Sequence, residues 1–292
     1  MNSAAQNKHT FNNWMSATPA IDTLSLTELT LPGTHNAGSD WKASWPLIPA
    51  HWLACQHESF YAQLNHGSRA LDIRLTYDAD APGLGKFRIH HNGYRNNRTL
   101  GNLVTDVNDF LKENPNEFII LDFHELSGDP FDFVYFNNMM KLFLGDRMIP
   151  SKNLPLNLRQ LKDISTTQRV LVAAPQHMAL DHNVFIREIE HKWSGSGITH
   201  IADLEKHITQ VLKYPQGTWA LWSLSATSYS ALGGPVDIHE TLDAWFAPEK
   251  SDWASKCNII NVDFMEESNI VSYCRSVNLV KASQRANASP RY

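Results

Sequence analysis

The chain has 292 residues, of which 42% are hydrophobic and 19% are charged. This composition supplies enough apolar side chains for a packed core and excludes a disordered or collagen-like protein. The 25 Lys and Arg residues against 30 Asp and Glu residues give a net charge of −5. Because no basic run is present, we expect no nucleic-acid partner. Barrels of this length are commonly single domains, so we expect one domain over residues 1–292, with residues 1–14 as an N-terminal segment.

The three cysteines, Cys55, Cys257 and Cys274, are odd in number and lack the spacing of a zinc site or a disulfide framework. We expect all three to be buried thiols. No apolar stretch approaches the ~20 residues of a membrane-spanning helix, and residues 1–14 lack the apolar part of a secretion signal. These features predict a soluble chain and leave its compartment open.

Short β-branched runs alternate with helical patterns along the chain, which is typical of βα units and a parallel sheet. Seven strands are predicted at residues 29–32, 70–75, 87–91, 118–123, 170–174, 219–224 and 259–264, and the clearest helices at 100–113 and 269–283. The polar segments 127–157 and 175–199 predict long loops or extra helices at a rim. Several strands are apolar on both faces, as strands between a barrel interior and outer helices are. We therefore predict an α/β fold, a TIM-like (βα) barrel of seven to eight parallel strands that is closed or incomplete.

Functional residues of such barrels gather at the carboxyl ends of the strands. The second predicted strand carries Asp72 and Arg74, and the polar residues near the ends of the other strands are His35, Asn36, His90, His91, Asp122, His124, Glu125, Asp263 and Glu266. Two imidazoles that titrate near neutrality can act as a base and an acid. An arginine can hold two phosphate oxygens at once. This combination predicts cleavage of a phosphodiester.

Several segments are also similar to one known family. They are LPGTHNAGS, LNHGSRALDIRL and FRIHHNGY in the first half, and WALWSLSATSYS and IINVDFMEESNIV nearer the C-terminus. These segments resemble the phosphatidylinositol-specific phospholipases C, particularly the small bacterial enzymes that consist of the catalytic barrel alone, and NNWMSATP resembles their amino-terminal helix. The resemblance implies a phosphoric diester hydrolase or lyase. Its substrate would be phosphatidylinositol in a membrane, and its products inositol 1,2-cyclic phosphate and diacylglycerol.

The resemblance also implies a role for each matching residue. His35 would be the general base that takes the proton of the inositol 2-hydroxyl, and His91 the general acid that protonates the leaving oxygen. Arg74 would bind the phosphate, with Asp72 as the carboxylate beside it, and Asp263 would orient the base histidine. No protein nucleophile is needed, because the ring holds the 2-hydroxyl next to the phosphorus.

Two residues give conflicting indications about a metal. Asn36 stands where the bacterial members usually have aspartate, and in the calcium-dependent members an asparagine there binds the metal. The metal-free members have an arginine that replaces the calcium ion, and Arg74 stands at that position. A guanidinium there would repel Ca²⁺. We therefore expect no cofactor. The alternative is a Ca²⁺ ion held by Asn36, Asp72 and either Asp122 or Glu125.

The residues that contact the inositol ring are less well defined. The fifth predicted strand lacks the basic residue that the bacterial members direct at the ring. His124, Glu125 and Tyr229 are the candidates for hydrogen bonds to ring hydroxyls, with a rim position and no direct contact as the alternative for each.

The segment 41–57 is rich in tryptophan and follows the first predicted strand. Indole side chains favour the lipid interface, so Trp41, Trp45 and Trp52 are predicted to contact the membrane. The alternative is that they pack against a neighbouring helix. The resemblance further implies a peripheral, monomeric, secreted enzyme, and a cytoplasmic location stays open.

Two other functions are compared with this one, because fold alone does not fix function. A metal-dependent phosphodiesterase of the same barrel type, acting on glycerophosphodiesters or sphingolipids, would have paired acidic metal ligands after the first histidine and no arginine at position 74. A catalytically silent lipid-binding module would have lost one of the two histidines.

Overall fold

A computed structural model of the chain describes residues 11–195, 199–214 and 216–288. Eight strands follow one another as parallel neighbours in the order β7-β6-β5-β2-β1-β12-β9-β8. Their bounds are β1 Leu31–Thr34, β2 Ala70–Tyr77, β5 Ile119–Ser127, β6 Val170–Ala174, β7 Phe185–Arg187, β8 Glu190–Lys192, β9 Trp222–Ser225 and β12 Ile259–Val262. Within the described residues β7 and β8 do not pair with each other. The predicted parallel barrel of seven to eight strands is therefore confirmed, in its incomplete form.

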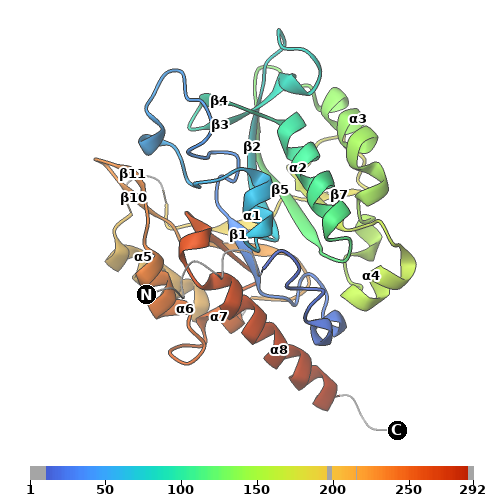
Figure 1. Cartoon of the computed structure of the whole chain (residues 1–292), viewed down its shortest axis with the longest axis vertical. Coiled ribbons are helices and arrows are strands. Elements are labelled where there is room, and N and C mark those ends of the chain that lie inside the picture. The colour runs from blue at the N-terminus through green and yellow to red at the C-terminus, as the bar shows by residue number, and fades with distance from the viewer. Residues whose placement is uncertain (1–10, 196–198, 215, 289–292) are drawn as a thin grey trace.

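Helices surround this sheet (Figure 1). They are α1 Phe60–Asn65, α2 Leu100–Glu113, α3 Phe133–Leu144, α4 Leu158–Ile164, α5 Ile201–Leu212, α6 His239–Phe246, α7 Trp253–Lys256 and α8 Ile270–Ala288. Short 3-10 helices lie at η1 Pro19–Thr23, η2 Ala50–Trp52, η3 Gly83–Lys86, η4 Gly145–Arg147, η5 Ser151–Asn153 and η6 Met265–Glu267. The two helices predicted most clearly are confirmed, the second with a longer C-terminal end. None of the described helices combines the length and apolar character that a membrane-spanning helix needs.

Alternation along the strands separates the barrel interior from the helix-facing side. Ile119, Leu121 and Phe123 of β5 pack in the apolar cluster that contains the buried face of α2, whereas Ile120 belongs to the other cluster. Successive strand residues point to opposite faces of a sheet. Asp122 therefore shares the inner face with Ile120 and is 3% exposed.

The predicted strand 87–91 forms, but it is not a barrel strand. It is β3 (Phe87–His91), which pairs antiparallel with the outer half of β2 and with β4 (Tyr94–Thr99). The turn between β3 and β4 is Asn92-Gly93, with φ of 51° and 82°. Both angles suit the two-residue hairpin turn for which Asn-Gly is favoured. His91 therefore lies at the end of a hairpin strand outside the path of parallel strands, and not at the end of a barrel strand as predicted.

Other predicted boundaries also differ. β1 and β9 begin two and three residues later than predicted, and the segment 175–199, predicted as loops or helices, contributes β7 and β8. A further small hairpin is made by β10 (Ser228–Ser230) and β11 (Gly234–Val236). The segment resembling an amino-terminal helix forms turns over residues 12–17, and residues 1–10 lie outside the described residues. Arg69 donates to the carbonyl oxygens of Phe11 and Asn12, which ties this segment to β2.

Candidate active site

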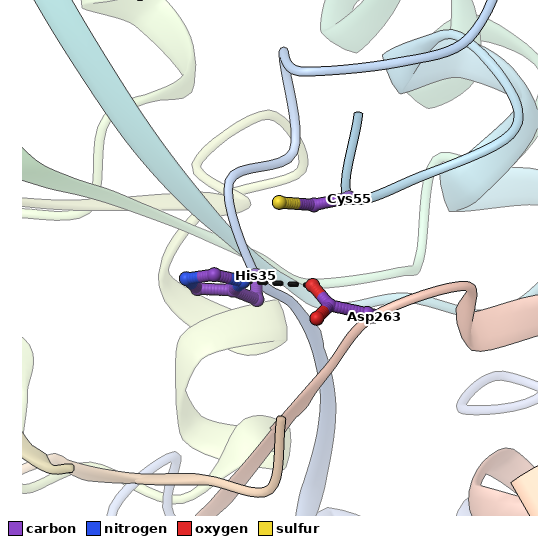
Figure 2. Close-up of side chains that lie close together, drawn as sticks. All are labelled: His35, Cys55 and Asp263. Atoms are coloured by element: carbon purple, nitrogen blue, oxygen red, sulfur yellow. Dashed lines mark hydrogen bonds and ion pairs between the residues drawn. The ribbon is translucent and has the colours of Figure 1, made fainter. Parts of the chain in front are cut away.

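The first pair of site residues follows from strand register. Thr34 and Val262 are register partners at the ends of the parallel neighbours β1 and β12. His35 and Asp263 are the next residues on each strand, so they emerge side by side. His35 Nδ1 lies 2.7 Å from Asp263 Oδ1, and this bond is drawn in Figure 2.

Asp72 and Arg74 come from the inner face of the neighbouring strand β2, where residues two apart share a face. The Arg74 guanidinium donates to Asp72 Oδ2 over 3.2 Å and lies 3.2 Å from His35 Nε2. A guanidinium can only donate, so Nε2 accepts and Nδ1 carries the proton that His35 donates to Asp263. This tautomer, assigned from the contacts, leaves the basic nitrogen of His35 on the side of Arg74.

The ion pair of Asp72 and Arg74 stays charged at neutral pH. Burial disfavours the ionised form of Asp72, but the adjacent Arg74 and the nearby histidines outweigh it and hold the pKa of Asp72 well below its usual range. Asp72 is therefore ionised at neutral pH and keeps Arg74 in place.

His91 is the second histidine. Its ring lies with its centroid 6.5 Å from that of His35 and at 87° to it. Nδ1 donates to the carbonyl oxygen of Leu53 over 2.6 Å, which leaves Nε2 as the nitrogen that can exchange a proton. The side chain is buried, and burial lowers the pKa of His91 to about 4. The ligand-free site therefore holds a neutral His91 at pH 7.

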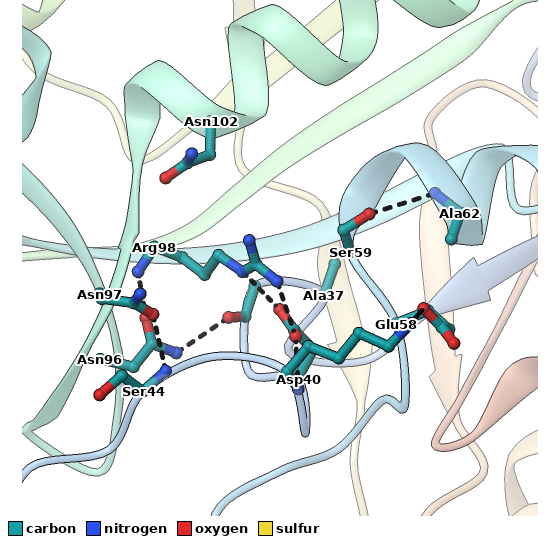
Figure 3. A network of polar contacts seen from close by, with 12 residues as sticks. Ala37, Asp40, Ser44, Glu58, Ser59, Ala62, Asn96, Asn97, Arg98 and Asn102 are labelled. Atoms are coloured by element: carbon teal, nitrogen blue, oxygen red, sulfur yellow. Dashed lines mark hydrogen bonds and ion pairs between the residues drawn. The ribbon is translucent and has the colours of Figure 1, made fainter.

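Leu53 belongs to the long loop after β1, and a polar network holds this loop against β4 (Figure 3). Asp40 is buried and accepts from the Arg98 guanidinium at 2.8 and 3.0 Å. Nearby, the Asn97 side chain accepts from the backbone N–H of Ser44 over 2.7 Å. The hairpin that carries His91 and the loop that carries its backbone acceptor are thus fastened together.

These residues face one cavity of about 560 Å³, a size suited to a small ligand. Its lining consists of His35, Arg74, His91, Asn92, His124, His191, Trp193, Thr199, Ser225, Thr227, Ser228, Tyr229, Pro235 and Asp263. Two of the three predicted ring-contacting residues, His124 and Tyr229, are among them. The third is not: Glu125 has a side chain that is 46% exposed and lies 3.6 Å from His90 Nε2. The position of Glu125 agrees with the alternative given for it, a place at the rim without direct contact with the ring.

Sequence reasoning missed His191, which lies on β8. Its Nε2 is 2.6 Å from Asp122 Oδ2, and its ring stacks on that of His124 with centroids 3.8 Å apart. Burial disfavours the imidazolium, but the hydrogen bond to Asp122 outweighs it and raises the pKa of His191. Three-residue strands such as β8 give almost no periodic signal, so nothing in the sequence singled this histidine out.

The residues of the alternative Ca²⁺ site lie on adjacent strands, where Asp72 and Asp122 are register partners, but their carboxylates have other partners. Asp72 is paired with Arg74 and Asp122 with His191, while Glu125 lies beside His90 and is not part of the cavity lining. Asn36 is buried in a left-handed conformation (φ 44°), and its backbone N–H donates to Asp72 Oδ2 over 3.2 Å. A calcium ion bound by Asp72 would have to compete with the Arg74 guanidinium for that carboxylate, so the arrangement favours the interpretation without a metal.

The three tryptophans predicted to contact a membrane differ in exposure. Trp41 is 44% exposed, whereas Trp45 is half-buried and donates its indole N–H to the Asp40 carbonyl. Trp52 is half-buried, and its carbonyl accepts from the Tyr229 hydroxyl. The most exposed apolar side chains in this region are Leu47 on the same loop and Leu232 in the β10–β11 hairpin, at 80% and 88%. Leu47 belongs to the apolar segment singled out in the sequence, whereas Leu232 was missed because a single leucine in a loop carries no pattern.

Comparison with known proteins gives named relatives, although no family model matches the chain. The 1-phosphatidylinositol phosphodiesterase of Listeria monocytogenes is 33% identical over 139 residues, which cover 45% of this chain and 39% of that protein. The chain thus matches about two fifths of that relative's length. The PI-PLC X domain-containing protein 3 of Mus musculus is 24% identical, with 98% of this chain and 99% of that protein aligned.

Solved structures match over nearly the whole chain. A phosphatidylinositol-specific phospholipase C from Staphylococcus aureus has a TM-score of 0.68 at 16% identity and covers 92% of this chain and 98% of its own. The corresponding enzyme of Listeria monocytogenes has a TM-score of 0.61 at 20% identity, with the same coverage. At these identities the match shows a shared fold. The resemblance to the phosphatidylinositol-specific phospholipases C that the sequence motifs indicate is therefore confirmed, in sequence by the named relatives and in fold by the solved structures.

Proposed function

We propose that this chain is a phosphatidylinositol-specific phospholipase C that works by general acid and base catalysis without a metal. The observation that carries the proposal is the convergence of His35, Arg74 and His91 on one cavity, with a carboxylate behind each of the first two. The named relatives that are phosphatidylinositol phosphodiesterases support the same substrate class.

The base step follows from the contacts of His35. When a phosphate enters, Arg74 donates to its oxygens in place of His35 Nε2, which makes that nitrogen available to the neighbouring 2-hydroxyl. As the proton moves to Nε2, the imidazolium that forms is stabilised by the bond from Nδ1 to Asp263. The 2-hydroxyl oxygen then attacks the phosphorus of the same molecule, and the ring geometry makes this attack effectively unimolecular.

The acid step requires a proton on His91 Nε2. Burial makes the free imidazole neutral, and the negative charge of a bound phosphodiester favours the imidazolium. Substrate binding is thus coupled to protonation of His91, which then protonates the diacylglycerol oxygen as it leaves.

Arg74 supplies the fixed positive charge that the transition state needs. Charge on the equatorial phosphoryl oxygens rises during the attack, and a preorganised guanidinium held by a buried carboxylate stabilises it without reorganisation. This arrangement replaces the role of a metal ion, so the residues of this chain account for each proton and charge in the reaction.

Measurement of head-group release from lipid vesicles tests this function. We expect a water-soluble inositol phosphate from phosphatidylinositol, in the presence of EDTA, and no release from phosphatidylcholine. The metal-dependent glycerophosphodiester or sphingolipid phosphodiesterase predicts the reverse: no release from phosphatidylinositol in EDTA, and metal-dependent cleavage of those other lipids.

We further propose that the enzyme contacts the membrane peripherally through Trp41 and Leu47, which lie on the loop beside the cavity. Half-buried Trp45 and Trp52 support that loop, and the hairpin with Leu232 packs beside η2. The monomeric state and the secreted, extracellular location that the resemblance implies stay predictions, as does the absence of a nucleic-acid partner.

A further inference from the structure

A second chemical feature lies directly behind the catalytic base. His35, Cys55 and Asp263 each present one metal-ligating atom, and these atoms all lie within 4.8 Å of one another. Figure 2 shows the Cys55 side chain extending over the bonded pair of His35 and Asp263 from the loop that follows β1. Thiol, imidazole and carboxylate form the donor set that zinc prefers.

Cys55 has no role in the proposed reaction. It is buried, and its Sγ lies 3.6 Å from the Leu53 carbonyl oxygen and 3.8 Å from His91 Nδ1. Both are weak contacts for sulfur. His35 and Asp263 line the cavity, so an ion in the cavity meets these two ligands first and the thiol immediately behind them.

A second, independent observation concerns Asn36. Its side chain is 2% exposed, yet neither its amide oxygen nor its amide nitrogen has a hydrogen-bond partner among the described residues. The Asn36 side chain lies beside the Cys55 thiol, and this weak contact with sulfur is the one side-chain interaction that its amide makes toward the three ligating groups. A buried amide without a partner costs free energy, and such groups are rare unless a ligand, water or ion satisfies them. Asn36 thus adds an oxygen donor beside the three ligating groups.

We propose that His35, Cys55 and Asp263 form a binding site for a thiophilic divalent cation such as Zn²⁺, and that the bound ion inhibits the enzyme. Three protein ligands leave a fourth tetrahedral position, which the Asn36 amide oxygen or a water can fill. Thiolate and carboxylate balance the charge of the ion, so a neutral centre forms beside the paired Arg74 and Asp72.

Inhibition follows from the proton balance at His35, and this step rests on the proposed function. The metal forms bonds to Cys55 Sγ, His35 Nδ1 and one Asp263 oxygen, and the thiol proton leaves to solvent. Because Nδ1 must present its lone pair to the metal, the imidazole proton moves from Nδ1 to Nε2. Nε2 then cannot accept the substrate proton, and the base is lost.

Two other groups of potential ligands carry no such inference. Asp122, His124 and His191 are also close together, but the two rings stack at an interplanar angle of 14°. One ion cannot lie in the planes of both stacked rings. The group of His57, Glu266 and Glu267 is partly exposed and offers no thiol.

Calorimetric titration of the full chain with Zn²⁺, without lipid, tests binding separately from catalysis. We expect the wild type to bind one Zn²⁺ ion per chain tightly. Cys55→Ser should bind Zn²⁺ at least ~10-fold more weakly, because it has lost a ligand. Cys257→Ser, which removes another buried thiol, and His57→Ala, which removes the surface group, should both keep this tight binding. Equal affinity in the wild type and Cys55→Ser, or no binding at micromolar Zn²⁺, would overturn the site.

Two further measurements complete the test. Co²⁺ bound to the wild-type protein should give the near-ultraviolet absorption of a thiolate-to-cobalt transition, which tests the thiol ligand even if Cys55→Ser does not fold. Its absence would also overturn the proposal. In the lipid assay, Zn²⁺ should inhibit the wild type reversibly and leave Cys55→Ser active. A wild type that binds Zn²⁺ through Cys55 but never cleaves phosphatidylinositol would refute the proposed function and retain the metal site.

Discussion

The two histidines of the site differ in the group that accepts a hydrogen bond from Nδ1. A carboxylate, Asp263, accepts from His35, whereas a backbone carbonyl, that of Leu53, accepts from His91. A carboxylate stabilises the imidazolium that a base becomes. A neutral carbonyl does so less, so the proton of His91 is held more weakly and is more easily given to a leaving group. The surroundings of each ring therefore match the role proposed for it.

Replacing either His35 or His91 by Ala should lower turnover by at least ~10³, because acid and base act in the same reaction and each contributes ~10²–10⁴. The far-ultraviolet circular dichroism of both variants should match that of the wild type. His182→Ala removes a histidine outside the cavity lining and serves as the control. Turnover near the wild-type rate in either catalytic variant would rule out the two-histidine mechanism.

Stability should fall on the acid side because His91 is buried in its neutral form. The folded-state pKa of His91 is about 4, below the value of about 6.5 in an unfolded chain. The unfolded state therefore takes up the proton first, and the folded state loses stability as pH falls from about 6.5 towards 4. Between pH 7.5 and 4.5 we expect the wild type to lose about 2–3 kcal/mol more unfolding free energy than His91→Gln, by urea denaturation. Equal losses would show that His91 is not buried as described.

At the scale of elements, the long loop after β1 supplies the acceptor of His91 and the tip that we assign to the membrane. The position of this loop depends on the ion pair between buried Asp40 and Arg98 of β4. Removing one partner of such a pair leaves an uncompensated charge.

We therefore expect Asp40→Ala to lower the unfolding free energy by about 2–4 kcal/mol and to reduce turnover through His91. The exposed pair Lys112 and Asp109 provides the matched control, since Asp109→Ala should cost no more than about 0.5 kcal/mol. A loss for Asp40→Ala as small as that of the control would mean that the network does not hold the loop.

The exposed part of the same loop can be tested separately. Trp41→Ala with Leu47→Ala should weaken binding to phosphatidylinositol vesicles by a few kcal/mol at most, because these side chains insert at the lipid interface. Activity on a water-soluble inositol phosphodiester should stay nearly unchanged. Equal losses on vesicles and on the soluble substrate would instead assign both residues to the packing of the cavity wall.

The catalytic residues could be predicted from the sequence better than the pairing of the strands that carry them. His35, Arg74 and Asp263 follow from strand ends and alternation, which local pattern and parallel register determine. The hairpin position of His91 could not be predicted, because β3 has the same alternating composition as a barrel strand and only its pairing with β2 and β4 distinguishes it. His191 was missed for a similar reason, since its partner Asp122 is 69 residues away.

For the whole molecule, the open barrel brings distant strands to one cavity. β8 lies at one end of the sheet path, and its His191 reaches Asp122 on β5, near the other end. This side-chain contact crosses the barrel interior and connects the two ends of the sheet, which share no backbone hydrogen bonds among the described residues. Catalytic groups from β1, β2, β12 and the β3–β4 hairpin then meet at the mouth, so the fold explains how residues from most of the chain form one site.

In the proposed function, this site cleaves phosphatidylinositol with Arg74 in the place of a metal. Phosphorus NMR of the reaction, run after exhaustive EDTA treatment, identifies the product and distinguishes Arg74 from a metal ion as the source of positive charge. We predict that the wild type forms inositol 1,2-cyclic phosphate at the same rate with and without EDTA, and that Arg74→Ala lowers this rate by at least ~10³. Loss of the cyclic product in EDTA and its recovery with Ca²⁺, with Arg74→Ala still active, would show instead that a metal ion supplies the positive charge.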